Sequence, residues 1–118
     1  MTARAQTAPI RIMPLGDSIT DGSSFDSPDG TGGYRGPLYN LLTAAGYNVD
    51  YIGSQTINSS QLVEQNHEGH SGWRIDQLDS NMAGWLGNLA DPDVVLMHIG
   101  TNDFGQSVEP RGTRARSR

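Results

Sequence analysis

Ser18 is the residue whose type and position most directly indicate chemistry. It lies in the segment Pro14 to Gly22, among small and turn-forming residues that follow the apolar run Ile10 to Leu15. A serine hydroxyl placed directly after a strand is exposed at the strand's carboxyl end, where open α/β sheets bind their ligands. The segment therefore indicates a nucleophile loop. A plain strand-to-helix turn, capped by Asp17 or Ser18, explains this loop taken alone equally well.

Two later polar segments are placed to join this serine. The first, His67 to Trp73, is dense in groups that can bind or polarise a ligand, and the second, Gly100-Thr101-Asn102-Asp103, follows the apolar run Val94 to Ile99. A continuous apolar run of this kind fits a central parallel strand covered on both faces. Because the carboxyl ends of parallel strands lie along one edge of a sheet, three residues are expected to converge there. These are Ser18, Gly72 and Asn102.

The apolar periodicity predicts three strands and two amphipathic helices. Strands are expected at residues 10–15, 49–52 and 94–99, and helices at residues 34–45 and from residue 75 to near Asp91-Pro92. Pro37 suits the first turn of the first helix, and Gly46 suits its C-cap. A helix between two strands forms a βαβ unit and implies a parallel sheet, so the fold class is α/β. We expect one domain at residues 10–106, between a flexible N-terminus at 1–9 and a disordered basic tail at 107–118.

The long polar connection from residue 54 to residue 72 is expected to be functional or disordered, because structureless connections of that length are uncommon in compact domains. It contains His67 and His70. Two histidines without an assured third ligand usually mean ordinary polar side chains, so we expect no metal site. His98, inside an apolar run, is expected to be a core residue and not a catalyst.

The composition excludes several classes of function. The sequence of 118 residues contains no lysine, which removes the P-loop, and no cysteine, which removes disulfides and thiolate zinc sites. The net charge is -5 although four of the eight arginines lie at or after Arg111, so the body is acidic and nucleic acid is not expected as a partner. No apolar run is long enough to span a membrane. Residues 1–9 lack the apolar centre of a signal peptide, which leaves the compartment open and a secreted parent conceivable.

Three ordered segments now resemble a known family. Gly16-Asp17-Ser18-Ile19, His70-Ser71-Gly72-Trp73 and Gly100-Thr101-Asn102-Asp103 look like the SGNH, or GDSL-type, hydrolases, and the match extends from about Ile10 to Gln106. The phrases Arg11 to Ser18 and Glu68 to Trp73 are most similar to the carbohydrate esterase branch that includes acetylxylan esterases. The resemblance implies an incomplete flavodoxin-like, three-layer α/β/α fold. It also implies a serine hydrolase without a cofactor, acting on a small ester or an acetylated carbohydrate.

The same resemblance implies a role for each segment. Ser18 would attack the ester carbonyl, while the backbone N–H groups of Ser18 and Gly72 and the side-chain amide of Asn102 would hold the oxyanion. Each such donor can lower the barrier by ~2.7–4 kcal/mol. Asp17 and Asp103 are expected to brace their loops. Trp73 and His70 are candidate substrate contacts.

One part of the family's machinery has no match in this sequence. A serine nucleophile needs a histidine base that is oriented by a carboxylate, and the family supplies both from a downstream Asp-x-x-His block. None of the histidines of this sequence, His67, His70 and His98, stands three residues after an aspartate. We therefore expect a C-terminally truncated piece of the family domain, with little or no esterase activity of its own. In such a piece the outer edge of the central strand is expected to be unpaired and part of its apolar surface uncovered, so the chain should be prone to associate.

Two alternatives stay open at this point. In one, His67 or His70 substitutes for the missing base. In the other, the domain is vestigial or binds carbohydrate without catalysis, and Trp73 stacks on sugar rings. Burial of Trp73 in the core is a third interpretation of that residue, and it is the commoner fate of a lone tryptophan.

Overall fold

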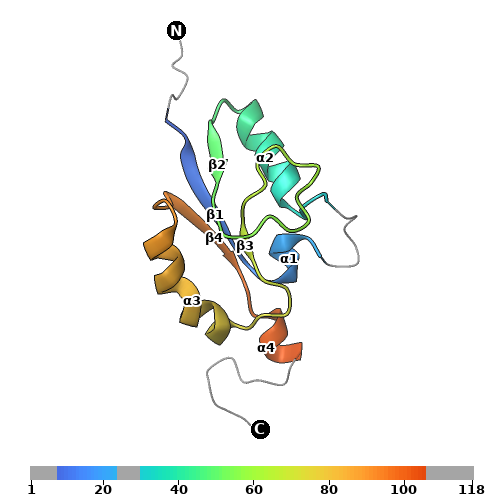
Figure 1. Cartoon of the computed structure of the whole chain (residues 1–118). Coiled ribbons are helices and arrows are strands. Elements are labelled where there is room, and N and C mark those ends of the chain that lie inside the picture. The colour runs from blue at the N-terminus through green and yellow to red at the C-terminus, as the bar shows by residue number, and fades with distance from the viewer. Residues whose placement is uncertain (1–7, 24–29, 106–118) are drawn as a thin grey trace.

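The computed structural model describes residues 8–23 and 30–105, which build a parallel β-sheet with helices on both faces (Figure 1). The strands are β1 (Ile10–Gly16), β2 (Val49–Tyr51), β3 (Glu68–Gly69) and β4 (Val94–His98). The helices are α1 (Ser18–Asp21), α2 (Arg35–Ala44), α3 (Ile75–Asn88) and α4 (Thr101–Gly105). The predicted α/β class is confirmed. Three elements, α1, β3 and α4, are too short for apolar periodicity to reveal.

β1 is the centre of the sheet. β2 pairs with the first residues of β1, β3 pairs with its last two, and β4 runs along its other edge. All three pairings are parallel, so the predicted βαβ unit is confirmed, with α2 between β1 and β2. Met13 and Leu15 of β1 are 0% and 2% exposed, as expected of a strand with neighbours on both sides.

β4 lies at the edge of the described sheet, with one edge unpaired and part of its apolar surface uncovered, as expected. Within residues 8–23 and 30–105 it pairs with β1 alone. Val95 and Met97 on one face are 41% and 67% exposed, and His98 is exposed instead of forming part of the core. An apolar run makes a strand suited to burial, but burial also needs neighbours, and the described residues supply them on one side only.

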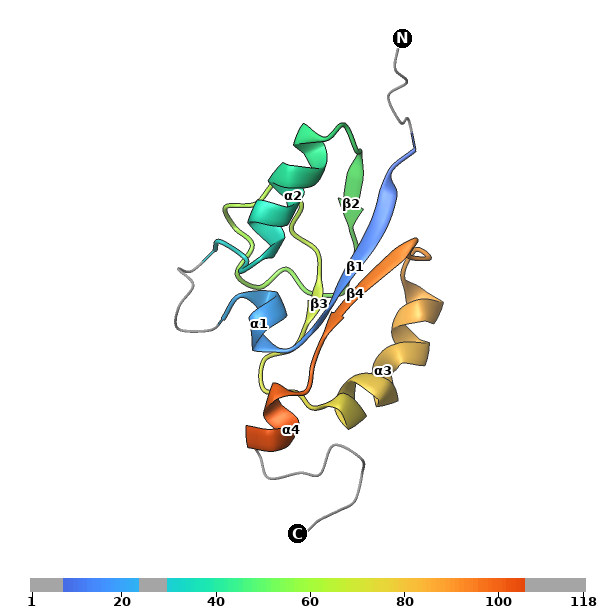
Figure 2. The same ribbon diagram turned by 180° about the vertical axis from the view of Figure 1, so that it is seen from behind.

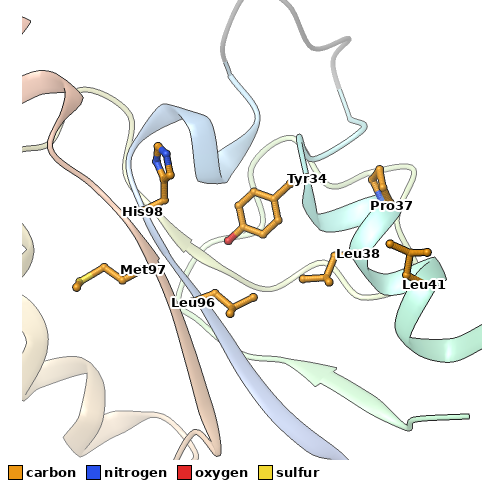
Figure 3. Close-up of a pocket in the computed structure, with 7 residues that line it drawn as sticks. All are labelled: Tyr34, Pro37, Leu38, Leu41, Leu96, Met97 and His98. Carbon is orange, nitrogen blue, oxygen red and sulfur yellow. The ribbon is translucent and has the colours of Figure 1, made fainter. Parts of the chain in front are cut away.

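An open apolar hollow of about 600 Å³ follows from this uncovered strand (Figure 3). It lies between α2 and β4, whereas α3 packs on the opposite face of the sheet, as Figures 1 and 2 together show. Its lining consists of Tyr34, Pro37, Leu38, Leu41, Leu96, Met97 and His98. None of the three expected rim residues contributes to it. The hollow is therefore an exposed part of the sheet face and not the expected reaction site.

The two long helices begin and end close to their predicted positions. α2 ends in a Schellman motif, because the N–H of Gly46 donates to the carbonyl of Thr43 and the N–H of Tyr47 to that of Leu42. Gly46 has φ +94, a conformation that glycine adopts without strain, and this confirms its predicted place after the helix. Within the described ranges, no helix is both long and apolar enough to traverse a lipid bilayer.

The core is small and contains a buried arginine. Ile12, Val49 and Tyr51 form an apolar cluster against α2. Arg35, which is 0% exposed, donates from its guanidinium to the carbonyl oxygens of Thr20 at 2.9 Å and Asp21 at 3.1 Å, and to Ser59 Oγ at 2.8 Å. A buried cation is tolerable only where its donors are satisfied. Arg35 therefore ties the carbonyl end of α1 to the loop that follows β2.

The connection from residue 54 to residue 72 is ordered and paired. It contains β3, and an isolated antiparallel bridge joins residues 55 and 67. Apart from residues 8 and 9, the predicted flexible N-terminus and the whole basic tail at 107–118 lie outside the described residues.

Candidate active site

The three segments expected at one rim do lie at the same end of the sheet. α1 follows β1, the turn at residues 70–73 follows β3, and α4 follows β4. Because these strands are parallel, their carboxyl ends point the same way. Figures 1 and 2 show α1, α4 and the chain that enters α3 gathered at that end.

Ser18 is the first residue of α1 and is half-buried. Asp17 caps this helix, since its Oδ1 accepts from the N–H of Ile19 at 3.0 Å. Amides of a first helical turn have no acceptor inside the helix, so α1 itself offers no acceptor to the Ser18 N–H. Asp17 thus braces the loop as predicted. Its role as a cap, considered above as an alternative, is compatible with a nucleophile at the next position.

The bend between β1 and α1 requires glycine at position 16. A Cβ atom on Gly16 would lie 2.2 Å from the carbonyl oxygen of His98 and 2.4 Å from Thr20 Oγ1. Gly69 of β3 is similarly close to α1, because a Cβ there would lie 2.6 Å from the Asp21 nitrogen. Glycine at these two positions therefore allows the serine loop to lie directly against β3 and β4.

Gly72 occupies a tight turn that follows β3. The carbonyl of His70 accepts from the N–H of Trp73 at 3.1 Å, and Gly72 has φ +82 at the third position, as a type II turn requires. The N–H of His70 donates to the carbonyl of Gly16 at 2.8 Å. The turn that carries Gly72 is therefore hydrogen-bonded to the last residue of β1, the strand that leads into Ser18.

Asn102 lies in α4, and its side-chain amide donates to the carbonyl of Trp73 at 3.0 Å. An amide nitrogen carries two N–H groups, and this bond uses one of them. The neighbouring Asp103 is 2% exposed, and its Oδ2 accepts from the N–H of Ile75 at 3.2 Å. Asp103 therefore braces α4 against the start of α3, as predicted. Two hydrogen bonds, Gly16 to His70 and Trp73 to Asn102, join the three segments into one rim.

His67 uses both ring nitrogens inside the protein. Its Nδ1 accepts from the N–H of Gly69 at 2.9 Å, so its Nε2 carries the proton and donates to the carbonyl of Ile57 at 2.8 Å. Burial, reinforced by the positive charge of Arg35, lowers the pKa of His67 to about 4. A fully buried, neutral and doubly bonded imidazole is poorly placed to act as a base for Ser18.

His70 is also engaged on both sides of its ring. Nε2 lies 2.6 Å from Glu68 Oε1, and Nδ1 lies 3.0 Å from the side-chain nitrogen of Gln55. The ring is 8% exposed and stacks on Trp73 at 4.0 Å and on Trp85 at 4.9 Å between centroids. This setting favours a structural role for His70 over contact with substrate, and it places half-buried Trp73 in an aromatic stack.

Three functional candidates escaped the sequence analysis: Glu68, Trp85 and Arg35. Glu68 lies inside the motif Glu68 to Trp73, which was noticed for its resemblance and not for its carboxylate. Trp85 is a half-buried residue of α3, and periodicity alone places it no nearer to a site than its neighbours. No sequence pattern signals that an arginine will be buried.

Comparison with known proteins identifies the fold's family. The sequence model of the GDSL-like Lipase/Acylhydrolase family matches residues 15–117. This chain belongs to that family. A multidomain esterase of Ruminococcus flavefaciens is 36% identical over an alignment of 115 residues. The match covers 80% of this chain and 14% of that protein.

Solved structures agree with this GDSL-like assignment. A family 3 carbohydrate esterase of Clostridium thermocellum superposes with a TM-score of 0.75 and 46% identity, covering 85% of this chain and 48% of the other. A family 3 carbohydrate esterase from Talaromyces cellulolyticus gives a TM-score of 0.65 and 34% identity, covering 83% of this chain and 46% of the other. An acetyl esterase mutant whose crystal structure contains an acetate ion gives a TM-score of 0.65 and 33% identity, covering 83% of this chain and 46% of the other. This GDSL-like chain thus spans about half the length of its solved relatives.

Proposed function

We propose that this chain carries the nucleophile and the oxyanion-binding part of an esterase that removes acetyl groups from carbohydrate. The observation that supports it is the hydrogen-bonded rim, in which Gly16 is joined to His70 and Trp73 to Asn102. These bonds give Ser18, Gly72 and Asn102 a common support at the carboxyl ends of three parallel strands.

In this proposal Ser18 Oγ bonds to the ester carbonyl carbon, and its proton passes to a base. The negative charge that develops on the carbonyl oxygen is stabilised by the N–H groups of Ser18 and Gly72 and by the second N–H of Asn102. The sugar oxygen then leaves with a proton, and water hydrolyses the acetyl-serine. Donors fixed before the reaction stabilise the transition state without reorganisation, which is what a braced rim provides.

The base is the part of the reaction that the described residues do not supply. His67 and His70 are both engaged on each ring nitrogen, and His98 has no carboxylate bonded to it among the described residues. Without a base, the oxyanion donors and substrate binding alone accelerate the reaction only ~10³–10⁴-fold over its rate in water. We therefore expect little activity from the 118-residue chain by itself.

The choice of an acetyl group and of a carbohydrate as the substrate in this proposal is based on the relatives. Two of the solved neighbours are family 3 carbohydrate esterases, and a third is an acetyl esterase with an acetate ion. A purely carbohydrate-binding role for Trp73 receives less support, because its ring already stacks on His70 and lies 6.1 Å from that of Trp85.

The test uses this chain joined to the part of the Clostridium thermocellum esterase that it does not cover, hereafter the joined protein. It should release acetate from acetylated xylo-oligosaccharides. Asn102→Ala should lower kcat by ~10²–10³, because one oxyanion donor is lost. Asn81→Ala is the matched control, since Asn81 is an exposed residue of α3 that donates only within its helix. Equal activity of the two variants would contradict the proposal.

A further inference from the structure

The turn that carries Gly72 has little packing of its own. Ser71 and Gly72 are both exposed, and a Cβ on Gly72 would meet no atom within 4 Å. The two ends of this turn are each hydrogen-bonded to a neighbouring segment, His70 to Gly16 and Trp73 to Asn102. A fixed oxyanion donor at Gly72 needs those ends to be rigid, because catalysis by such donors depends on their placement before the reaction.

His70 contributes to both ends of the turn, through its backbone at one end and through its ring stack on Trp73 at the other. The backbone N–H of His70 is bonded to Gly16, its carbonyl accepts from Trp73, and its ring stacks on Trp73 at 4.0 Å with an angle of 22° between the planes. A rotation of the His70 ring would disturb the stack and the turn together. The orientation of that ring is fixed in turn by what its nitrogens contact.

Glu68 is the strongest of those contacts. The Glu68 side chain is 0% exposed. Its Oε1 accepts from His70 Nε2 at 2.6 Å and from Ser54 Oγ at 2.6 Å. Its Oε2 accepts from the Ser54 N–H at 2.7 Å. Burial raises the pKa of Glu68, but the hydrogen bonds from His70 and Ser54 outweigh burial and hold it below its ordinary value. The ionised carboxylate is therefore an acceptor for each of its donors. Glu68 also pairs with Leu15 in the sheet, three residues before Ser18.

We propose that Glu68, acting through the His70 ring, is a positioning residue that fixes the turn carrying the Gly72 N–H of the oxyanion site. The inference rests on the proposed function, which gives Gly72 its role. It assigns to the buried carboxylate the task of holding one oxyanion donor in register with the serine loop, through a contact chain from Glu68 to His70 to the turn.

The competing account makes Glu68 and His70 a catalytic pair, with the imidazole as base for Ser18. A histidine oriented by a carboxylate must present its second nitrogen to the serine. Here Nδ1 of His70 faces Gln55 instead, and the ring stacks on the indole rings of Trp73 and Trp85. The two accounts differ in a measurable way, because only positioning requires the turn itself to change when Glu68 is altered.

The test compares Glu68→Gln with Glu64→Gln in the ¹⁵N-labelled 118-residue chain by NMR. Glu64 is the matched control, because its carboxylate accepts from the N–H of Tyr51 at 2.9 Å and touches no part of the turn. Glu68→Gln should shift or split the amide resonance of Gly72 and speed hydrogen exchange at the Trp73 amide about tenfold or more, as loss of a hydrogen bond to a charged group implies. Glu68→Gln should leave the amide resonance of Tyr51 unchanged. Glu64→Gln should shift the amide resonance of Tyr51 and leave those of Gly72 and Trp73 unchanged.

An unchanged Gly72 resonance in folded Glu68→Gln would overturn the proposal, whether or not esterase activity falls. If Glu68→Gln does not fold, Ser54→Ala replaces it, since it removes the Ser54 hydroxyl from Glu68 without touching His70. The same resonances should then shift by a smaller amount, and their constancy would also overturn the proposal. Because these readouts need no catalysis, a failure of the proposed esterase function, seen as full activity in Ser18→Ala, is distinguished from a failure of the positioning role.

Discussion

At the scale of single residues, burial of an ionisable side chain makes the stability of the fold depend on pH, and His67 is the clearest case. Because burial lowers its pKa to about 4, the folded protein keeps it neutral where the unfolded chain, with an ordinary pKa near 6.5, already binds a proton. The groups facing it are Arg35, Glu68 and His70.

The sign of the pH effect follows from that difference. Below pH 6.5 the unfolded chain binds more protons at this residue than the folded protein does, so stability falls as the pH decreases towards about 4. The loss from this residue should approach about 3 kcal/mol. Urea unfolding at several pH values should show that the stability difference between the wild type and His67→Gln shrinks from pH 7 to pH 4.5. Parallel pH profiles for the two proteins would contradict the assignment.

At the scale of secondary-structure elements, glycine decides how closely β1 can approach its neighbours. Gly16→Ala should destabilise the protein strongly, because its Cβ would collide with the backbone oxygen of His98 at 2.2 Å. Gly84→Ala is the control. A Cβ at Gly84, within α3, meets no atom within 4 Å, and the change should stabilise the helix by ~0.5–1 kcal/mol. Thermal unfolding measures both, and a Gly16→Ala protein as stable as the wild type would show that β1 and β4 are not so closely packed.

The sequence predicts the long elements well because each carries many apolar residues in phase. The helix predicted at residues 34–45 is α2, with each end shifted by one residue. The helix predicted from residue 75 is α3, which ends at Asn88, about three residues before the predicted end near Asp91-Pro92. β3 was missed because two residues cannot show a period. Its pairing with β1 is a long-range contact, and it is this contact that brings Gly72 to the serine loop.

The site was predictable in its residue types but not in its support. Ser18, Gly72 and Asn102 follow strands, and parallel pairing alone places them at one end. The bonds that fix them there involve Glu68, Gln55 and the Trp73 carbonyl, whose partners are set by folding and not by spacing. Their roles as nucleophile and oxyanion donors stay predictions until activity is measured.

At the scale of the whole molecule, the described sheet has an open edge with apolar side chains on both faces of β4. Such an edge can pair with another strand, so we expect the 118-residue chain to self-associate as its concentration rises. Met97→Lys should reduce association, since Met97 is 67% exposed on that strand. Val63→Lys, at a residue 75% exposed in the loop after β2, is the control and should change little. Analytical ultracentrifugation measures both, and equal association of the two variants would exclude the β4 edge as the contact.

The open edge of β4 was expected from the resemblance to a larger fold, whereas the residues of β4 by themselves suggest a central strand. Its apolar run suits burial on both faces, and the described residues cover β4 only in part. Whether the remaining surface is covered depends on contacts that a run of residues does not encode.

The most direct test of the account is whether Ser18 becomes acetylated during turnover. The joined protein is mixed with 4-nitrophenyl acetate, quenched in acid and digested, and the peptide that contains Ser18 is analysed by mass spectrometry. The account predicts an acetyl group on the Ser18 hydroxyl. Ser18→Ala should lose both this adduct and turnover. Ser80→Ala, a change at an exposed serine of α3, is the control and should keep both. Turnover close to that of the unmutated joined protein in Ser18→Ala, or an acetyl group on another residue with Ser18 unmodified, would contradict it.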